Sequence, residues 1–285
     1  MQRGVMVKSK RELEQMRAAG KINAKALAAA VAKIEPGITT AEINAAAAAV
    51  LKQYGAEPAF VGVPGAYPFP AETTISINDE LVHGIPGKRR LEEGDIVSID
   101  CGTVFEGFVG DSALTVGVGD ISVDAQKLID VTRESLFAGI AKMVPEKRTG
   151  DVSAAIQEFV EINGFQVVRE YTGHGVGRSM HEDPQVPNYG TEGRGLPLKP
   201  GMTIALEPMV LSGRFETRVL SDRWTVASKD GKLTAHFEHT VAITENGPWI
   251  LTARDEDLDD EIWIRYNDYF VGWPRETSGS RSSIA

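Results

Sequence analysis

The sequence has only one cysteine, Cys101, among its 285 residues, so the chain cannot form a disulfide within itself. Its longest uncharged apolar runs, around residues 26–32 and 43–51, are far shorter than the roughly 18 residues that a membrane span requires. Charged side chains are scattered through the first twenty residues, which excludes the apolar stretch of a secretory signal. These absences favour a cytoplasmic protein that does not enter a membrane.

Basic charge is also scarce, because 30 lysines and arginines face 40 acidic residues and leave a net charge of −10. Contacts to nucleic-acid phosphates need clustered lysine and arginine, so we expect no specific nucleic-acid partner. The remaining composition is ordinary, with 42% hydrophobic, 25% charged and 7% aromatic residues. This balance excludes a disordered chain and allows a core large enough to enclose an active site.

The acidic excess is strongest in residues 254–285, which hold eight acidic residues and four arginines. The same segment contains five aromatic residues within eleven positions, Trp263, Tyr266, Tyr269, Phe270 and Trp273. Aromatic rings bury a large apolar area, so we expect about Leu258–Trp273 to pack against the body as a structural strap. The alternative is that this C-terminal extension docks a partner such as the ribosome.

The remaining chain alternates between pairs of helices and groups of strands. Ser9 with Glu12, and Thr39 with Glu42, form capping-box patterns that predict two helices, ending near Pro36-Gly37 and at Gly55. Further helices are expected over about Val123–Met143 and Asp151–Asn163, and strands over Thr73–Ile77, Ile96–Ile99 and Val116–Val118.

The two helix pairs are related by an internal repeat. Four landmarks recur 109 residues later, with Pro145, Thr149, Val152 and Gly164 matching Pro36, Thr40, Ile43 and Gly55. Residues 91–100 also match residues 198–207, which places Asp100 over Glu207. The repeat predicts one domain over residues 1–253, built from two α+β halves at about 9–120 and 121–253 around a pseudo-twofold axis. We expect a site between the halves.

Four acidic residues are expected to meet at that site. Asp100 and Asp111 flank a predicted hairpin, and their odd separation of 11 places both side chains on the same face of the sheet. Glu238 lies in a strand expected over 235–244, where alternation places His236, Glu238 and Thr240 on one face. The repeat then brings Asp100, Asp111, Glu207 and Glu238 together.

Four converging carboxylates would repel one another by several kcal/mol in a partly buried cleft unless they are neutralised. Neighbouring strand residues supply no lysine or arginine, whereas two divalent cations would cancel the charge. A lone histidine is usually structural, but all five histidines, His83, His174, His181, His236 and His239, lie in strand or loop motifs. Oxygen ligands with an imidazole suit manganese, iron, cobalt or zinc, and a pair of such ions can activate water for hydrolysis.

These motifs together resemble a type I methionine aminopeptidase. They are residues 76–86 (SINDELVHGIP), Asp100 with Asp111, residues 173–177 (GHGVG), residues 181–184 (HEDP), residues 207–209 (EPM) and residues 237–240 (FEHT). The resemblance runs from about Ser9 to Ala253. It implies the pita-bread fold, a central curved antiparallel sheet backed by helices, in a monomer. It also implies removal of the initiator methionine from nascent proteins whose second residue is small.

The same resemblance assigns roles to individual residues. It implies that Asp100 chelates one metal ion, that His174 and Glu207 hold the other, and that Asp111 and Glu238 bridge the two. It further implies that Glu207 is the general base, and that His83 and His181 contact the substrate and the oxyanion that develops during hydrolysis. Tyr67 and Trp224 are the residues it places in the methionine pocket.

Three positions depart from the pattern of the resembling family: Phe60 replaces a frequent cysteine, Met180 a frequent aromatic residue, and His236 a glutamine. The first alternative function is that of a prolidase or aminopeptidase P, which shares the fold and the metals. Those chains usually carry a further N-terminal domain and an arginine-containing context for the second bridging glutamate. The second alternative is a binding module without catalysis, which the retention of every ligand position argues against.

Overall fold

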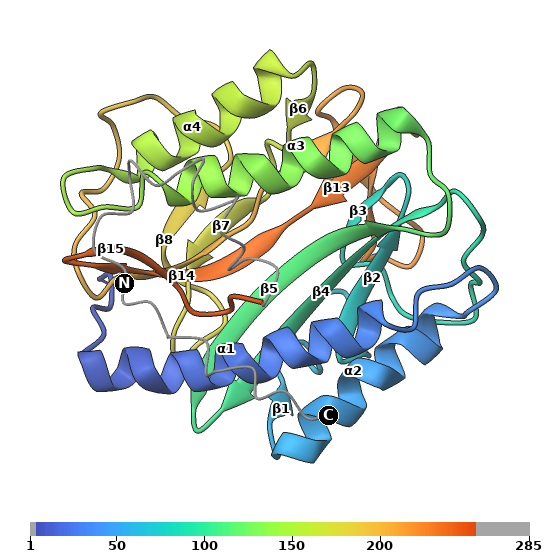
Figure 1. Ribbon diagram of the computed structural model, residues 1–285, viewed down its shortest axis with the longest axis horizontal. Helices are drawn as coiled ribbons and strands as arrows, with labels where there is room; N and C mark the ends of the chain where they lie inside the picture. Colours follow the sequence, from blue (N-terminus) through green and yellow to red (C-terminus); the bar gives the residue numbers. More distant parts are fainter. Residues whose placement is uncertain (1–3, 255–285) are drawn as a thin grey trace, which may run out of the picture.

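The computed structural model describes residues 4–254, so the strap predicted over Leu258–Trp273 lies outside the described residues. Two antiparallel helix pairs lie along a curved sheet, α1 and α2 across the bottom of Figure 1 and α3 and α4 across its top. The helices are α1 (Lys10–Val31), α2 (Thr40–Tyr54), α3 (Val123–Ile140) and α4 (Thr149–Ile162). Within residues 4–254, none of these helices combines the length and apolarity needed to cross a membrane.

The helix ends follow the capping signals of the sequence. Both predicted capping boxes form, and Gly55 ends α2 in the left-handed conformation with φ 65°. Three boundaries differ from expectation, and the first is that α1 ends at Val31, five residues before Pro36. Helix α3 stops three residues early, at Ile140, and α4 begins two residues early, at Thr149. The carboxylate of Asp151 explains the early start of α4, because it accepts the main-chain N–H of Arg148 at 2.7 Å and so caps the helix from inside its first turn.

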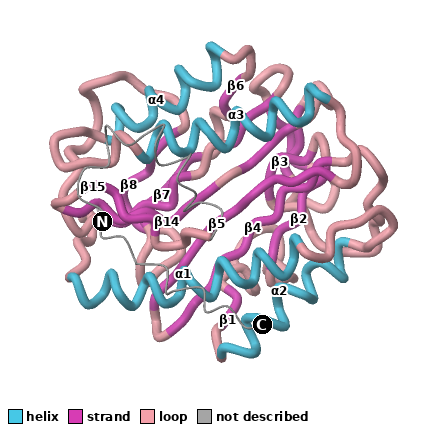
Figure 2. Tube along the Cα trace, in the orientation of Figure 1, coloured by secondary structure: helices cyan, strands magenta, loops and turns pink. Residues whose placement is uncertain are grey.

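The main sheet has nine strands, and the tube in Figure 2 shows them running between the two helix pairs. Its hydrogen-bonded path is β1-β4-β5-β14-β9-β7-β8, with β2 beside β4 and β15 beside β14. The bounds are β1 (Glu57–Pro58), β2 (Thr73–Ile77), β4 (Ile96–Phe105), β5 (Phe108–Gly117), β7 (Thr172–Gly175), β8 (Glu182–Pro187), β9 (Thr203–Leu206), β14 (Glu238–Thr244) and β15 (Gly247–Ile250).

Strands β4 and β5 form the predicted hairpin. Glu106 and Gly107 make its two-residue turn, with φ of 50° and 79°, as a type I′ turn requires. The strand expected over Ile96–Ile99 therefore extends to Phe105, and the separate strand expected over Val116–Val118 is instead the end of β5, which stops at Gly117. A tight turn lets pairing continue along both strands, which the short apolar runs alone did not indicate.

Two small sheets stand beside the main one. The first joins β13 (Thr234–His236), β10 (Met209–Leu211) and β6 (Gln166–Val167), and the second joins β11 (Thr217–Val219), β12 (Val226–Ser228) and β3 (Glu80–Val82). The strand predicted over 235–244 is thus divided between β13 and β14. Phe237 interrupts it because its main-chain N–H donates to the carbonyl of Pro208 at 3.2 Å rather than to a sheet neighbour.

The duplication predicted from the repeat is present in the fold. Helices α1 and α2 with the β4–β5 hairpin make one half, and α3 and α4 with β9 and β14 make the other. The halves join where β14 pairs with β5, with Glu238 opposite Ala113. A single cluster of buried apolar side chains crosses this junction, from Ile22 in α1 to Ile156 in α4.

Asn23 fastens α1 to the hairpin. Its side chain is fully buried, and its amide nitrogen lies within hydrogen-bonding distance of the carbonyl oxygens of Cys101 and Gly110, the latter at 3.1 Å. Its amide oxygen accepts the hydroxyl of Ser112. These bonds satisfy groups on both strands of the hairpin that carries two of the four acidic residues.

We expect Asn23→Ala to lower the free energy of unfolding by about 2–4 kcal/mol, because buried partners on β4 and β5 lose their hydrogen bonds and a small cavity opens. Urea unfolding measures this change. Glu14→Ala, on the exposed side of the same helix, is the matched control and should shift stability by less than about 0.5 kcal/mol. Equal stability of the two variants would contradict the anchoring role of Asn23.

Candidate active site

Strand register places the four acidic residues at the junction of the two halves. Asp100 is opposite Ala113, and Asp111 is opposite Gly102, so their side chains lie on the same face two positions apart. Glu238 begins β14, also facing Ala113. Glu207 directly follows β9, the other neighbour of β14. The predicted convergence of these carboxylates is therefore what the sheet produces.

His174 joins the acidic residues from β7, where it pairs with Ala205 of β9. Its Nε2 lies 3.5 Å from Oε1 of Glu207 and 3.9 Å from Oδ2 of Asp111. Its Nδ1 lies 2.9 Å from the carbonyl oxygen of Gly175, to which a proton on Nδ1 donates. That bond selects the tautomer with a free lone pair on Nε2, the form that a metal ligand needs.

Several of the carboxylate oxygens are buried without a hydrogen-bond donor. Oδ1 of Asp100, Oδ1 of Asp111 and Oε1 of Glu238 are inaccessible and accept no hydrogen bond. Burial, with repulsion from the neighbouring acids as the second cause, holds the pKa of Asp111, Glu207 and Glu238 well above the usual range. Burial also raises the pKa of Asp100 to about 8. Buried anionic oxygens without donors are costly unless a cation accompanies them.

The donor set fits a divalent metal ion. Asp111, His174 and Glu238 each offer a ligand atom within 4.8 Å of the others. Carboxylate oxygens with one imidazole are typical ligands of manganese, iron, cobalt and zinc.

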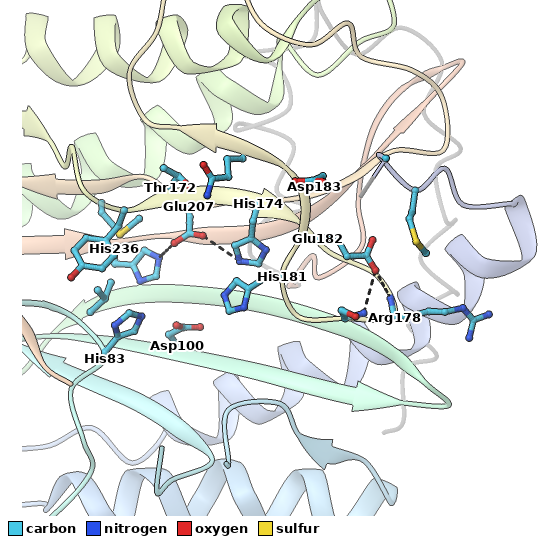
Figure 3. Close-up of a pocket in the computed structure, with 17 residues that line it drawn as sticks. His83, Asp100, Thr172, His174, Arg178, His181, Glu182, Asp183, Glu207 and His236 are labelled. Carbon is cyan, nitrogen blue, oxygen red and sulfur yellow. Dashed lines mark hydrogen bonds and ion pairs between the residues drawn. The ribbon is translucent and has the colours of Figure 1, made fainter. Parts of the chain in front are cut away.

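Four imidazoles surround the acidic centre formed by the four carboxylates. Figure 3 shows the rings of His83, His174, His181 and His236 gathered around Asp100 and Glu207. The His181 ring lies 4.5 Å from that of His174, centroid to centroid. Burial, followed by repulsion between the imidazoles, lowers the pKa of His83 and of His174 to about 4. The pKa of His181 is also lowered by burial. These rings are therefore neutral near pH 7 and can donate or accept hydrogen bonds.

His236 lies beside two of the acids, as the strand face it was expected to share with Glu238 indicated. It ends β13, and its Nε2 is 3.9 Å from Oε2 of Glu207 and 3.9 Å from Oε2 of Glu238. Its ring is buried, and its Nε2 has no hydrogen-bond partner. Burial lowers the pKa of His236 to about 3. A neutral imidazole thus occupies the position for which the resemblance led us to expect a glutamine.

A cleft of about 710 Å³ opens onto this centre. Asp100, His174, Glu207 and His236 line its inner part, and His83 and His181 stand along its walls. Several lining residues were not singled out individually in the sequence, among them Val82, Tyr171 and Met209. Each lies within three residues of a motif histidine or glutamate, which was the available signal. The N-terminal segment also contributes Gly4 and Met6 to the lining.

Trp224 and Tyr67 are placed next to this cleft. The Trp224 ring packs edge-on against His83, with centroids 6.3 Å apart. Its indole N–H donates to the Tyr67 carbonyl at 3.1 Å, while the Tyr67 hydroxyl donates to the Asp222 carbonyl at 2.9 Å. Neither Trp224 nor Tyr67 is among the described residues that line the cleft. Their assignment to the methionine pocket stays a prediction.

Comparison with known proteins places the site in a family. The model of metallopeptidase family M24 matches residues 14–245. The chain is 50% identical over 248 residues to a methionine aminopeptidase of Clostridium perfringens, covering 87% of this chain and 98% of the relative. It is also 50% identical to methionine aminopeptidase 1 of Bacillus subtilis, covering 87% and 99%.

Solved structures agree. A methionine aminopeptidase from Thermotoga maritima superposes with a TM-score of 0.86 at 46% identity, covering 88% of this chain and all of that one. A Pyrococcus furiosus prolidase gives 0.71 at 27% identity, and the match spans only 66% of the prolidase. The chain therefore belongs to metallopeptidase family M24 and has its pita-bread fold. Within that family it belongs with the methionine aminopeptidases, not the prolidases.

The buried acids predict how the metal-free protein responds to pH. The pKa of Asp100 is about 8 in the folded protein, against an ordinary value of 3.8, so the folded state binds more protons than the unfolded chain between these values. The stability contributed by this group is complete below the unfolded value and is lost as pH rises through the folded one.

We therefore expect the melting temperature in the presence of a chelator to fall as pH is raised from about 5.5 to 8.5. Asp100→Asn should make this decline shallower, because the amide does not titrate. Thermal unfolding of both proteins across that range is the measurement. An unchanged slope in Asp100→Asn would show that Asp100 does not contribute to the pH dependence.

Proposed function

We propose that this aminopeptidase removes the initiator methionine from nascent cytoplasmic proteins whose second residue is small. The observation that carries the proposal is the convergence of four carboxylates and Nε2 of His174 at one cleft, which Asp100, Glu207 and His174 line. Sequence identity of 50% with methionine aminopeptidases supports the substrate.

We assign two divalent metal ions to this centre. Asp100 would hold one ion, His174 and Glu207 the other, and Asp111 and Glu238 would contact both. Two divalent cations match four carboxylate charges, and the unpartnered oxygens of Asp100, Asp111 and Glu238 support this ligand set. When bound, such ions polarise the scissile carbonyl and lower the pKa of a water molecule.

The side chains around the metals divide the remaining chemistry. Glu207 is the general base, which takes a proton from the attacking water and gives it to the departing amine. Its side chain keeps 14% of its surface exposed, on the cleft side of the acidic centre. His181 donates a hydrogen bond to the oxygen that gains negative charge, and His83 orients the substrate. The lowered pKa of both imidazoles keeps them neutral for these roles.

The bridging assignment predicts that Asp111→Ala and Glu238→Ala each lose metal and activity together, because each carboxylate contacts both ions. We expect less than about one equivalent of metal per chain and a fall in kcat/KM of more than about 1,000-fold. Metal analysis of the purified variants and hydrolysis of a Met-Ala peptide measure the two effects. Glu92→Ala, an exposed acid outside the site, is the control. Two equivalents retained in either variant would disprove bridging.

Substrate choice separates the proposed function from its alternatives. After metal reconstitution, we expect Met-Ala peptides to be cleaved at least about 10-fold faster than Met-Leu peptides, because a restricted site beyond the methionine pocket excludes the longer side chain. Peptides that begin with Pro-Pro should not be cleaved. Turnover of Pro-Pro substrates alone would favour the aminopeptidase P alternative, and binding of metal without hydrolysis would favour a module without catalysis.

A further inference from the structure

A buried ion pair lies at the outer part of the cleft, away from the acidic centre. Nζ of Lys8 is 2.6 Å from Oε2 of Glu182, and their side chains are only 4% and 8% exposed. Lys8 precedes α1, whereas Glu182 begins β8, 174 residues further along the chain. The pair therefore joins the N-terminal segment to the second half of the molecule.

The surrounding backbone is shaped to receive Lys8. Its main-chain N–H donates to the Gly201 carbonyl at 2.7 Å, and its Nζ also donates to the Met6 carbonyl at 3.2 Å. A Cβ at position 177 would overlap Cε of Lys8, and a Cβ at position 201 would lie 2.6 Å from the Lys8 carbonyl oxygen. Glycine at both positions leaves the space that this buried lysine occupies.

Glu182 uses its second oxygen to close the loop that carries His181. Oε1 accepts the main-chain N–H groups of Arg178 at 2.9 Å and Ser179 at 3.2 Å. Figure 3 shows Glu182 and Arg178 farther along the cleft than His181 and His174. Glu182 directly follows His181, so the residue that carries the imidazole lies between the carboxylate-bearing residue and the two amides that the carboxylate accepts.

We propose that Lys8 is a positioning residue, which acts through Glu182 to hold the 178–182 loop and so sets the place of His181 over the substrate. The loss of Lys8 leaves a buried carboxylate without its cation, so Glu182 turns toward water and releases the amides of Arg178 and Ser179. The N-terminal segment that contains Lys8 also supplies Gly4 and Met6 to the cleft lining. The N-terminal residues therefore form part of the substrate side of the site.

The kinetic test of the role of Lys8 rests on the proposed function, because it uses a methionyl peptide as substrate. We expect Lys8→Met to reduce kcat on a Met-Ala peptide by about 10- to 100-fold, which is the loss that a displacement near 1 Å can cause, with metal content unchanged. Lys10→Met, an exposed lysine two residues away, is the matched control and should keep parental activity. Parental kcat in Lys8→Met would overturn the proposal.

A double-mutant cycle with His181 distinguishes positioning from general destabilisation. In the His181→Ala background the added Lys8→Met change should cost less than about 2-fold, because the residue on which Lys8 acts is already gone. A loss of the same size in both backgrounds would assign Lys8 a merely structural role and overturn the proposal. If Lys8→Met does not fold, Glu182→Gln replaces it in the cycle, since glutamine keeps an oxygen for the two amides but not the ion pair.

Hydrogen exchange gives a readout that does not depend on the reaction. We expect the amides of Arg178 and Ser179 to exchange at least about 10-fold faster in Lys8→Met than in the parent, while amides of β4 and β5 keep their protection. Unchanged exchange at both amides would overturn the proposal even if the kinetics changed. If the parent does not cleave Met-Ala peptides, the proposed function fails, and hydrogen exchange alone decides whether Lys8 holds the loop.

Discussion

Repulsion among four buried carboxylates is the constraint on which this structure depends. The acidic residues occupy the junction of the two halves, where the pairing of β4, β5, β14 and β9 brings them together. Burial raises every one of their pKa values, so the centre is poorly suited to a protein without bound cations. Apolar packing behind the sheet, together with anchors such as Asn23, must hold the strands in place against this repulsion.

The two halves share an arrangement of two helices and a strand pair but differ in the connection between the acidic residues of that pair. In the first half, a two-residue turn separates the strands that carry Asp100 and Asp111. In the second half, 31 positions separate Glu207 from Glu238, and this stretch forms β10, β11, β12 and β13. The excursion brings His236 against the acidic centre and Trp224 against His83. The repeat thus builds the acidic centre, and the unequal insertion adds His236 and Trp224 to its surroundings.

The cleft combines two electrostatic environments. Its inner part holds neutral imidazoles around acidic ligands, so hydrogen-bond direction there is set by tautomers and not by net charge. Its outer part is held by the ion pair of Lys8 with Glu182, in which the charges are matched and buried. The positive charge of Lys8 is thus paired with Glu182, the residue after His181, and not with the four acids of the inner part.

Local patterns in the sequence were sufficient for the helix caps, the Glu106-Gly107 turn and the placement of Asp100 and Asp111 on one face, because each depends on residues close together or on the period of a strand. They also indicated the duplication. Only the tertiary structure decided that Phe237 interrupts a strand, that Tyr67 bonds to Asp222, and that Lys8 meets Glu182. These features arise from contacts between distant segments, whose positions depend on how the halves pack and not on the residues beside them.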